Sequence, residues 1–210
     1  MRILSSSNQI FVISAPSGAG KTSLVDALLN KDTNIVGCTS HTTRPLREGE
    51  INGENYHFVD DSEFMKLIKN NQFIEYANVF GFRYGTSELE LEKTLNAGLD
   101  VILEIDWQGA EQVRNAYNNC SSIFILPPSL SALEERLRSR GKDTAEVIKA
   151  RSQEAAREIK QCDNFDYVIV NDDFNKALQE LVTIINAVRL ETGKQRLKLA
   201  SLLRNLLPDE

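Results

Sequence analysis

Short apolar runs alternate with longer stretches of mixed charge along most of the chain. Each run is four to six residues long and rich in branched side chains, which is the pattern of a buried strand. Helical stretches follow these strands, and this order predicts β-α-β crossovers and a parallel sheet flanked by helices. The sequence therefore predicts an α/β fold. Its predicted strands are 10–13, 101–106, 122–126 and 167–170, and its first predicted helix is 21–29.

Two internal segments interrupt this alternation. Residues 39–96 contain clustered Thr, Gly, Tyr and Phe with short strand-like runs, which predicts an inserted subdomain of mixed strands and helices. Residues 131–161 have a helical pattern and many arginines, so we expect a helical lid there. The remaining segments are expected to form one core, made of residues 8–38, 97–130 and 162–190.

The last twenty residues, 191–210, are expected to form a C-terminal helix outside the main domain, 8–190. Leucines recur there at i, i+3, i+4 and i+7, which places them on one face of a helix. Such a face packs on the parent domain or on a second copy of the chain, so a homo-oligomer formed through this helix is one expectation. The leucines are Leu199, Leu202, Leu203 and Leu206.

Composition and charge narrow the classes of function. The 210 residues carry 24 Lys+Arg against 30 Asp+Glu, a formal net charge of −6, which argues against a general nucleic-acid coat. No apolar run is long enough to span a membrane, and the broken N-terminal pattern is a poor signal peptide. Three scattered cysteines fit reduced thiols in a cytoplasmic protein rather than a disulfide framework or a metal site: Cys38, Cys120 and Cys162.

A glycine-rich stretch joins the first predicted strand to the first predicted helix. It matches the phosphate-binding pattern G-x-x-x-x-G-K-[ST] except that Ala15 replaces the first glycine. In this context backbone N–H groups and the positive helix end form a nest for a polyphosphate, and Lys21 adds charge at the β- and γ-phosphates. The Thr22 hydroxyl suits Mg²⁺. The alternative is a plain small-residue turn. The stretch is Ala15, Pro16, Ser17, Gly18, Ala19, Gly20, Lys21 and Thr22.

Two carboxylates lie at the end of the second predicted strand. Parallel sheets place ligand-binding residues at the carboxyl ends of their strands, so Asp106 is a candidate for holding Mg²⁺ through water. Glu104 lies two residues earlier and therefore on the same face. A carboxylate within an apolar strand needs a partner, which we expect to be an arginine or the substrate. The alternative is an aspartate that only ends a strand.

Arginines are concentrated in two further places. Arg44 and Arg47, with Tyr56 nearby, suit a second phosphate group because arginine forms paired hydrogen bonds to phosphate. A charged turn is the alternative. The predicted lid supplies positive charge for phosphoryl transfer, with Gly141 as a hinge, although most helical arginines are simply solvated. The lid arginines are Arg136, Arg138, Arg140, Arg151 and Arg157.

Several separated motifs, in order, resemble the bacterial guanylate kinases over roughly residues 8–190. The motifs are S-A-P-S-G-A-G-K-T (14–22), T-T-R-x-x-R-E-G-E (42–50), Glu75 with Tyr84-Gly85-Thr86, I-D-W-Q-G (105–109), R-S-R-G (138–141) and V-N-D-D (170–173). The resemblance implies a P-loop NTPase core, an inserted GMP-binding subdomain and an Arg-rich helical lid. It implies transfer of the ATP γ-phosphoryl group to GMP, and also to dGMP, in purine nucleotide metabolism.

The resemblance also implies roles for individual residues. Lys21, Arg44, Asp106, Arg140 and Arg151 would be catalytic. Mg²⁺ bound with ATP would be held by Thr22 and, through water, by Asp106. Arg136, Asn171 and Asp172 would contribute to the ATP site. A carboxylate accepts the two neighbouring N–H donors of guanine and would be unpaired against adenine, so Glu75 would select the base. The implied GMP-binding residues are Ser40, Arg44, Arg47, Glu50, Tyr56, Glu75, Tyr84, Thr86 and Glu104.

Two other functions remain open from the sequence. One is a non-enzymatic module of similar fold that binds phosphorylated partners, but such modules lack a complete phosphate loop, and this chain has Gly20, Lys21 and Thr22. The other is a P-loop kinase with a different acceptor, such as a sugar phosphate, which the set Ser40, Glu75 and Thr86 argues against.

Overall fold

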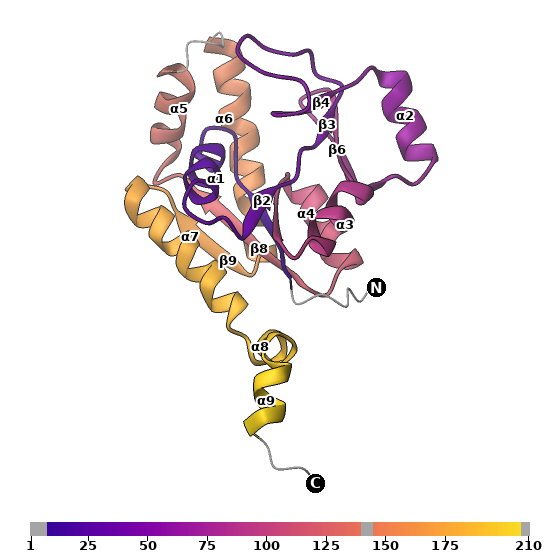
Figure 1. The fold of residues 1–210 in the computed structure, drawn as a ribbon. Coiled ribbons are helices and arrows are strands. Elements are labelled where there is room, and N and C mark those ends of the chain that lie inside the picture. The colour runs from indigo at the N-terminus through magenta and orange to yellow at the C-terminus, as the bar shows by residue number, and fades with distance from the viewer. Residues whose placement is uncertain (1–7, 140–144, 207–210) are drawn as a thin grey trace.

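A five-stranded sheet forms the centre of the computed structural model, which describes residues 8–139 and 145–206. Its strands are β1 (Ile10–Ser14), β2 (Ile35–Gly37), β7 (Asp100–Glu104), β8 (Cys120–Leu126) and β9 (Tyr167–Val170). All neighbours are parallel, in the order β2-β7-β1-β8-β9. Figure 1 labels β2, β8 and β9 of this sheet at the centre of the molecule. The four predicted strands are therefore confirmed. The three-residue edge strand β2 was not predicted, because it contains only two apolar residues.

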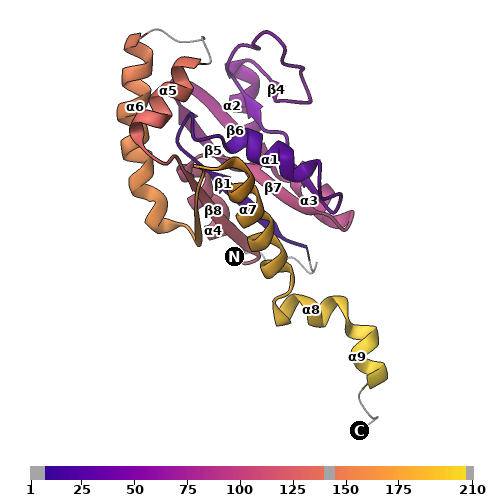
Figure 2. The same ribbon diagram turned by 90° about the vertical axis from the view of Figure 1, so that its left-hand side faces the viewer.

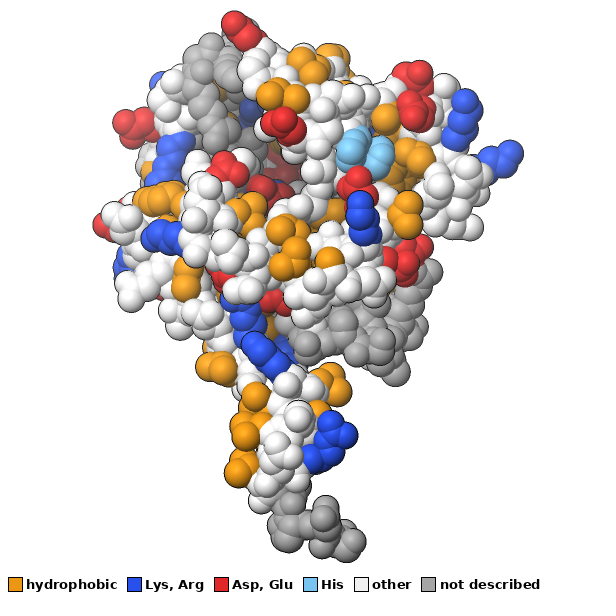
Figure 3. Space-filling view, viewed as in Figure 1, with side chains coloured by type: hydrophobic (Ala, Val, Ile, Leu, Met, Phe, Trp, Pro, Cys, Tyr) orange, Lys and Arg blue, Asp and Glu red, His pale blue; other side chains and the backbone are white. Residues whose placement is uncertain are grey.

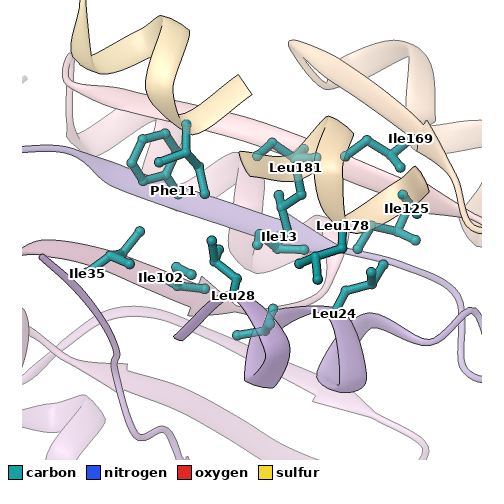
Figure 4. Close-up of a cluster of buried hydrophobic side chains, with 14 of the residues drawn as sticks. Phe11, Ile13, Leu24, Leu28, Ile35, Ile102, Ile125, Ile169, Leu178 and Leu181 are labelled. Atoms are coloured by element: carbon teal, nitrogen blue, oxygen red, sulfur yellow. The ribbon is translucent and has the colours of Figure 1, made fainter. Parts of the chain in front are cut away.

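Helices cover both faces of this sheet, and alternate residues of β1 point to opposite sides. Phe11 and Ile13 face α1 (Lys21–Leu29) and α7 (Phe174–Arg189), as Figure 4 shows for Leu24, Leu28, Leu178 and Leu181. Ile10 and Val12 face α3 (Glu88–Asn96) and α4 (Trp107–Ala116). All five residues of β1 are buried. The result is a layered α/β fold with a parallel sheet flanked by helices, as the sequence predicts.

A second, smaller sheet lies beside the first one. It contains β3 (His41–Thr42), β4 (His57–Phe58), β5 (Phe73–Val79) and β6 (Phe82–Ser87) in the order β4-β3-β6-β5. β6 runs antiparallel to both of its neighbours, while β3 and β4 are parallel. α2 (Asp61–Lys69) packs here through Phe64, whose ring lies 4.7 Å from that of Phe73. These elements fall within the expected insertion, 39–96.

The helix α3, which the expected insertion includes, packs elsewhere. Leu91 and Leu95 are buried against Val101 and Leu103 of the parallel sheet. Their spacing of four residues places them on one helix face, and that face covers the core rather than the smaller sheet. The smaller sheet therefore ends before α3, and the insertion boundary expected at residue 96 stays a prediction.

Two helices occupy the segment expected as the lid, α5 (Leu130–Ser139) and α6 (Ala145–Ile159), followed by the short 3₁₀ helix η1 (Lys160–Asn164). Leu133, Leu137, Ile148 and Ala155 form a small apolar cluster between them. Figure 2 shows α5 and α6 side by side along one flank of the molecule. Arg140 and Gly141 lie outside the described residues.

The C-terminal segment forms two helices instead of the single one expected. α8 (Thr192–Lys198) and α9 (Ala200–Leu206) meet at Leu199, whose backbone leaves the helical conformation, and they extend away from the body (Figure 2). Leu197, Leu202 and Leu206 are exposed. An oligomer formed through this segment stays a prediction. None of the helices in residues 8–139 and 145–206 has the length and apolar character needed to cross a membrane.

Candidate functional site

One cleft, with a cavity of about 260 Å³, lies between the carboxyl edge of the parallel sheet, the smaller sheet and α6. Figure 3 shows a hollow in this region with acidic side chains on its floor. The cleft brings together Lys21 and Arg47, the two cations predicted to face different phosphate groups. The predicted site residues that line it are Ala15, Pro16, Ser17, Gly18, Gly20, Lys21, Thr22, Ser40, Arg47, Tyr56, Glu75, Tyr84, Glu104, Asp106 and Arg151.

Several predicted residues lie behind the cleft wall. They support residues that line it, as described below, and they are Ala19, Arg44, Glu50, Thr86, Arg136 and Asn171. Asp172 is exposed. Arg140 lies outside the described residues, so its predicted role stays a prediction.

The loop between β1 and α1 depends on two glycines. Gly18 and Gly20 have φ values of 95° and 93°, a left-handed conformation that costs side-chain-bearing residues about 1–2 kcal/mol. A Cβ on Gly20 would also lie 2.4 Å from Nδ2 of Asn171. With these bends the loop opens directly into the first turn of α1, and Lys21 and Thr22 enter the cleft.

Asn171 and Arg136 hold the back of this loop. The Asn171 side chain donates to the Ala19 carbonyl at 2.8 Å, and Arg136 donates to the Asn171 carbonyl at 2.9 Å and to the Ala19 carbonyl at 3.4 Å. Asn171 is 5% exposed. Both side chains therefore donate to the Ala19 carbonyl of the loop, and the sequence motif alone did not indicate this supporting position.

We expect Asn171→Ala to lower the free energy of unfolding by about 1–2 kcal/mol, because it leaves the buried Ala19 carbonyl without this donor. The loop would also lose its support, so the KM for the nucleotide bound there should rise. Urea unfolding and steady-state kinetics measure the two effects. Asn175→Ala, the same change at an exposed position on α7, is the control. Equal behaviour of the two variants would contradict the supporting role.

Oxygen atoms gather beside the loop at the ends of β1 and β7. The parallel register aligns Ile13 with Glu104, so the Glu104 carboxylate reaches the start of α1 and accepts from the Thr22 hydroxyl at 3.1 Å. Asp106 caps α4, accepting from the Gly109 N–H and from the Gln108 amide, each at 2.9 Å. Asp106 thus lies two residues after the end of β7, caps the start of α4 and still lines the cleft.

A chain of hydroxyls and one carboxylate forms the opposite end of the cleft. Glu75 on β5 lies directly across from Thr86 on β6. The Thr86 hydroxyl donates to Glu75 at 2.6 Å and lies 3.2 Å from the Ser40 hydroxyl. Glu75 is 2% exposed, and this burial raises the pKa of its carboxyl to about 7.

Gly109 makes the position of Glu75 feasible. A Cβ on this glycine would lie 2.4 Å from a Glu75 carboxylate oxygen, so α4 approaches β5 closely only because residue 109 is glycine. The glycine belongs to the I-D-W-Q-G motif, but the sequence did not reveal which residue it approaches.

The buried Arg44 and the half-buried Glu50 form an ion pair at the same end of the cleft. Two hydrogen bonds of 2.8 and 3.0 Å join them, and the Arg44 guanidinium lies 5.5 Å from the Tyr56 ring centre. Hydrogen bonding to Arg44 holds the pKa of Glu50 below its usual value. Burial raises the pKa of Tyr56 to about 12. Above this pair, Arg47, Tyr56 and Tyr84 line the cleft.

The helix α6 contributes Arg151 and Glu158 to the cleft. Arg151 lies over the ring of Phe80, with its Cζ 5.5 Å from the ring centre. Burial, together with the charge of the nearby Asp106, raises the pKa of the Glu158 carboxyl to about 7. Neither Phe80 nor Glu158 was predicted. The sequence gives no signal for Glu158, which looks like any charged residue of a helix. Phe80 could have been noticed, because a phenylalanine directly before Gly81 is unusual in a turn.

Comparisons with known proteins agree with this geometry. The family model described as guanylate kinase matches residues 7–188. The guanylate kinase of Hahella chejuensis is 52% identical over 96% of this chain and 97% of its own length. That of Histophilus somni is 52% identical over 94% and 97%. The crystal structure of guanylate kinase from Anaplasma phagocytophilum gives a TM-score of 0.75 at 37% identity, over 94% of this chain and 96% of that one. The chain therefore belongs to the guanylate kinase family.

Proposed function

We propose that this chain transfers the γ-phosphoryl group of ATP to GMP, giving ADP and GDP, with dGMP as a second acceptor. The observation that carries the proposal is one cleft with the phosphate loop at one end and the buried carboxylate of Glu75, a hydrogen-bond acceptor, at the other. Such a cleft suits two nucleotides whose phosphates meet in the middle, and direct transfer needs that arrangement.

The buried carboxylate accounts for the choice of guanine. Ionised Glu75 accepts the N1–H and the exocyclic amine of guanine side by side. Adenine offers the opposite polarity at that edge and would leave the carboxylate unpaired, which a buried site penalises strongly. The Thr86 hydroxyl fixes the Glu75 side chain, and Ser40 lies at the cleft surface beside it.

The acceptor phosphate is assigned to the wall formed by Arg47, Tyr56 and Tyr84. Arg44 lies behind this wall and is held by Glu50 at 2.8 Å. Hydroxyl and guanidinium donors suit a phosphate monoester, since each phosphate oxygen accepts several hydrogen bonds. Glu50 therefore acts on GMP through Arg44 rather than by its own contact.

The residues beside the phosphate loop fit Mg²⁺. Their donor set is made of oxygen atoms alone, from Thr22, Glu104 and Asp106, and hard oxygen ligands are what Mg²⁺ prefers. No group of three His, Cys, Asp or Glu side chains that could bind a metal occurs among the described residues, so nucleotide oxygens and water would complete the shell. When bound with ATP, Mg²⁺ would neutralise charge on the transferring phosphates.

The cleft residues supply position and charge rather than a general base. The GMP phosphate is already anionic at neutral pH, so it attacks without losing a proton to the protein. Lys21 from the loop and Arg151 from α6 face the same cavity and stabilise the negative charge that is shared between donor and acceptor oxygens. The walls around both nucleotides exclude water, which would otherwise take the phosphoryl group.

A coupled ADP-release assay with ATP and each of GMP, dGMP, AMP, CMP and UMP tests the proposal. We expect turnover with GMP and dGMP and little with the other acceptors. Binding of GMP without turnover would identify a non-enzymatic module instead. Turnover with AMP, CMP or UMP but not with GMP would identify a kinase of another acceptor class.

GMP affinity should fall by about tenfold between pH 8 and pH 6, because the ionised fraction of a carboxyl with a pKa of about 7 falls by that factor. GMP affinity falls, rather than rises, at low pH because only the ionised Glu75 carboxylate can accept hydrogen bonds from both guanine donors. Protonation stabilises the free fold, and this contribution is lost as pH rises through 7. Isothermal titration with GMP measures the affinity. Glu75→Gln should retain only the dependence of the GMP phosphate itself, and an unchanged profile in that variant would contradict the assignment.

The proposal also includes the cellular compartment of the reaction and the nucleotide metabolism that it serves. We place the reaction in the cytoplasm, supported by the free thiols of Cys38, Cys120 and Cys162, which are typical of a reducing compartment. The reaction there would return GMP to the purine nucleotide pool.

A further inference from the structure

The turn between β5 and β6 places a phenylalanine where the backbone disfavours it. Phe80 and Gly81 connect the two strands with φ values of 51° and 81°. Two-residue hairpin turns with both residues in this left-handed region strongly favour Asn-Gly or Asp-Gly. A bulky residue with positive φ is an outlier, and such strain is found most often at functional positions.

The Phe80 side chain does not contribute to the hydrophobic core. It is 48% exposed, so burial does not explain its presence at the tip of the hairpin. Its ring instead faces the Arg151 guanidinium, with Cζ 5.5 Å from the ring centre. This distance lies within the range of attractive cation–π contacts, and arginine is the cation most often found in them.

The contact joins two parts of the molecule at the cleft. Phe80 lies at the end of β5, the strand that carries Glu75, and Arg151 lies on α6. Both side chains line the cavity that contains Lys21 and Asp106. The strand thus links the predicted guanine contact directly to the predicted catalytic arginine.

An aromatic partner suits an arginine that has to bind phosphate. The N–H groups of an arginine guanidinium are the donors that bind a phosphate. The face of a ring attracts the cation but uses none of those donors. The phenylalanine ring therefore contacts the guanidinium at the cleft and itself occupies none of these donors.

We propose that Phe80 is a positioning residue that holds Arg151 over the cleft for phosphoryl transfer. The proposal rests on the phosphotransferase activity proposed above. It explains why a strained aromatic residue occupies an exposed turn. It also connects the binding of guanine at Glu75 on β5 with the position of the Arg151 guanidinium on α6.

Phe80→Asn separates this role from a structural one. Asparagine is better suited to the backbone of the turn, so the thermal unfolding midpoint should stay constant or rise. Turnover should fall by about tenfold because the cation loses its alignment, while the KM values for ATP and GMP change less than twofold. A structural role would lower stability and activity together. Phe80→Tyr, which retains the ring face, should restore turnover to within about twofold of the unmodified chain.

Two further variants complete the experiment. Phe82→Ala changes the other aromatic residue of the hairpin tip, which is 36% exposed, and its turnover should match that of the unmodified chain. In an Arg151→Ala background, Phe80→Asn should cause no additional loss, since the two residues act as a unit. A normal turnover for Phe80→Asn, or its full effect in the absence of Arg151, would overturn the proposal. Failure of the unmodified chain to phosphorylate GMP would instead refute the proposed function.

Discussion

Lys21→Ala is expected to lower kcat by about three orders of magnitude, on the scale observed when a preorganised charge is removed from a phosphoryl-transfer site. Lys21 is the cation that the phosphate loop itself brings into the cleft, and its charge matters most when negative charge moves between the two phosphates. GMP binding should be retained because Glu75, Arg47 and Tyr84 lie on the opposite wall.

Steady-state kinetics with saturating ATP and GMP measure the loss of turnover, and titration calorimetry measures the retained GMP binding. Lys31→Ala, at an exposed lysine just after the end of the same helix, is the matched control and should behave like the unmodified chain. A kcat within tenfold of normal in Lys21→Ala would exclude the role assigned to this residue.

Glu75→Gln should reduce kcat/KM for GMP by roughly two to three orders of magnitude, because an amide offers one acceptor and presents a donor to the second guanine N–H. The carboxylate is 2% exposed, so water has little access to satisfy the mismatched groups. Activity with AMP is expected to be low in the unmodified chain and to change little in the variant. The ratio of GMP to AMP use therefore measures the guanine contact directly.

Glu63→Gln, at an exposed position on α2, removes the same charge from the insertion without touching the cleft. Its GMP to AMP ratio should be that of the unmodified chain. An unchanged ratio in Glu75→Gln would show that guanine is recognised elsewhere, while a large loss of stability in that variant would be detected by urea unfolding before the kinetics are compared.

Local patterns made the core and the phosphate loop predictable. Residues 10–13 are apolar throughout and lead directly into the glycine turn, so one contiguous stretch specifies the strand, the loop and the start of the helix. The alternation of apolar runs and helical stretches likewise predicted the parallel sheet. Two features escaped prediction because their signals are weak or not local: the short edge strand β2 and the division of the C-terminal segment into α8 and α9.

The supporting contacts of the site come from distant parts of the sequence. Asn171 and Ala19 are 152 residues apart, and Arg136 and Ala19 are 117 apart, so no local pattern relates them. The position of α3 on the core sheet is similar, because its apolar spacing is the same whichever sheet it covers. Family resemblance named most of the cleft residues, but it did not separate those that line the cleft, such as Arg47, from those behind it, such as Glu50.

By itself the sequence determined the element types, the parallel core and the phosphate loop, because hydrophobic periodicity and a glycine motif act within a few consecutive residues. Only the tertiary structure decided which distant side chains meet. Strand register brought Glu75 against Thr86 and Glu104 to Thr22, and packing of α6 against the β5–β6 turn brought Arg151 over Phe80. These contacts depend on strand order and helix placement, which the balance of packing across the whole chain determines.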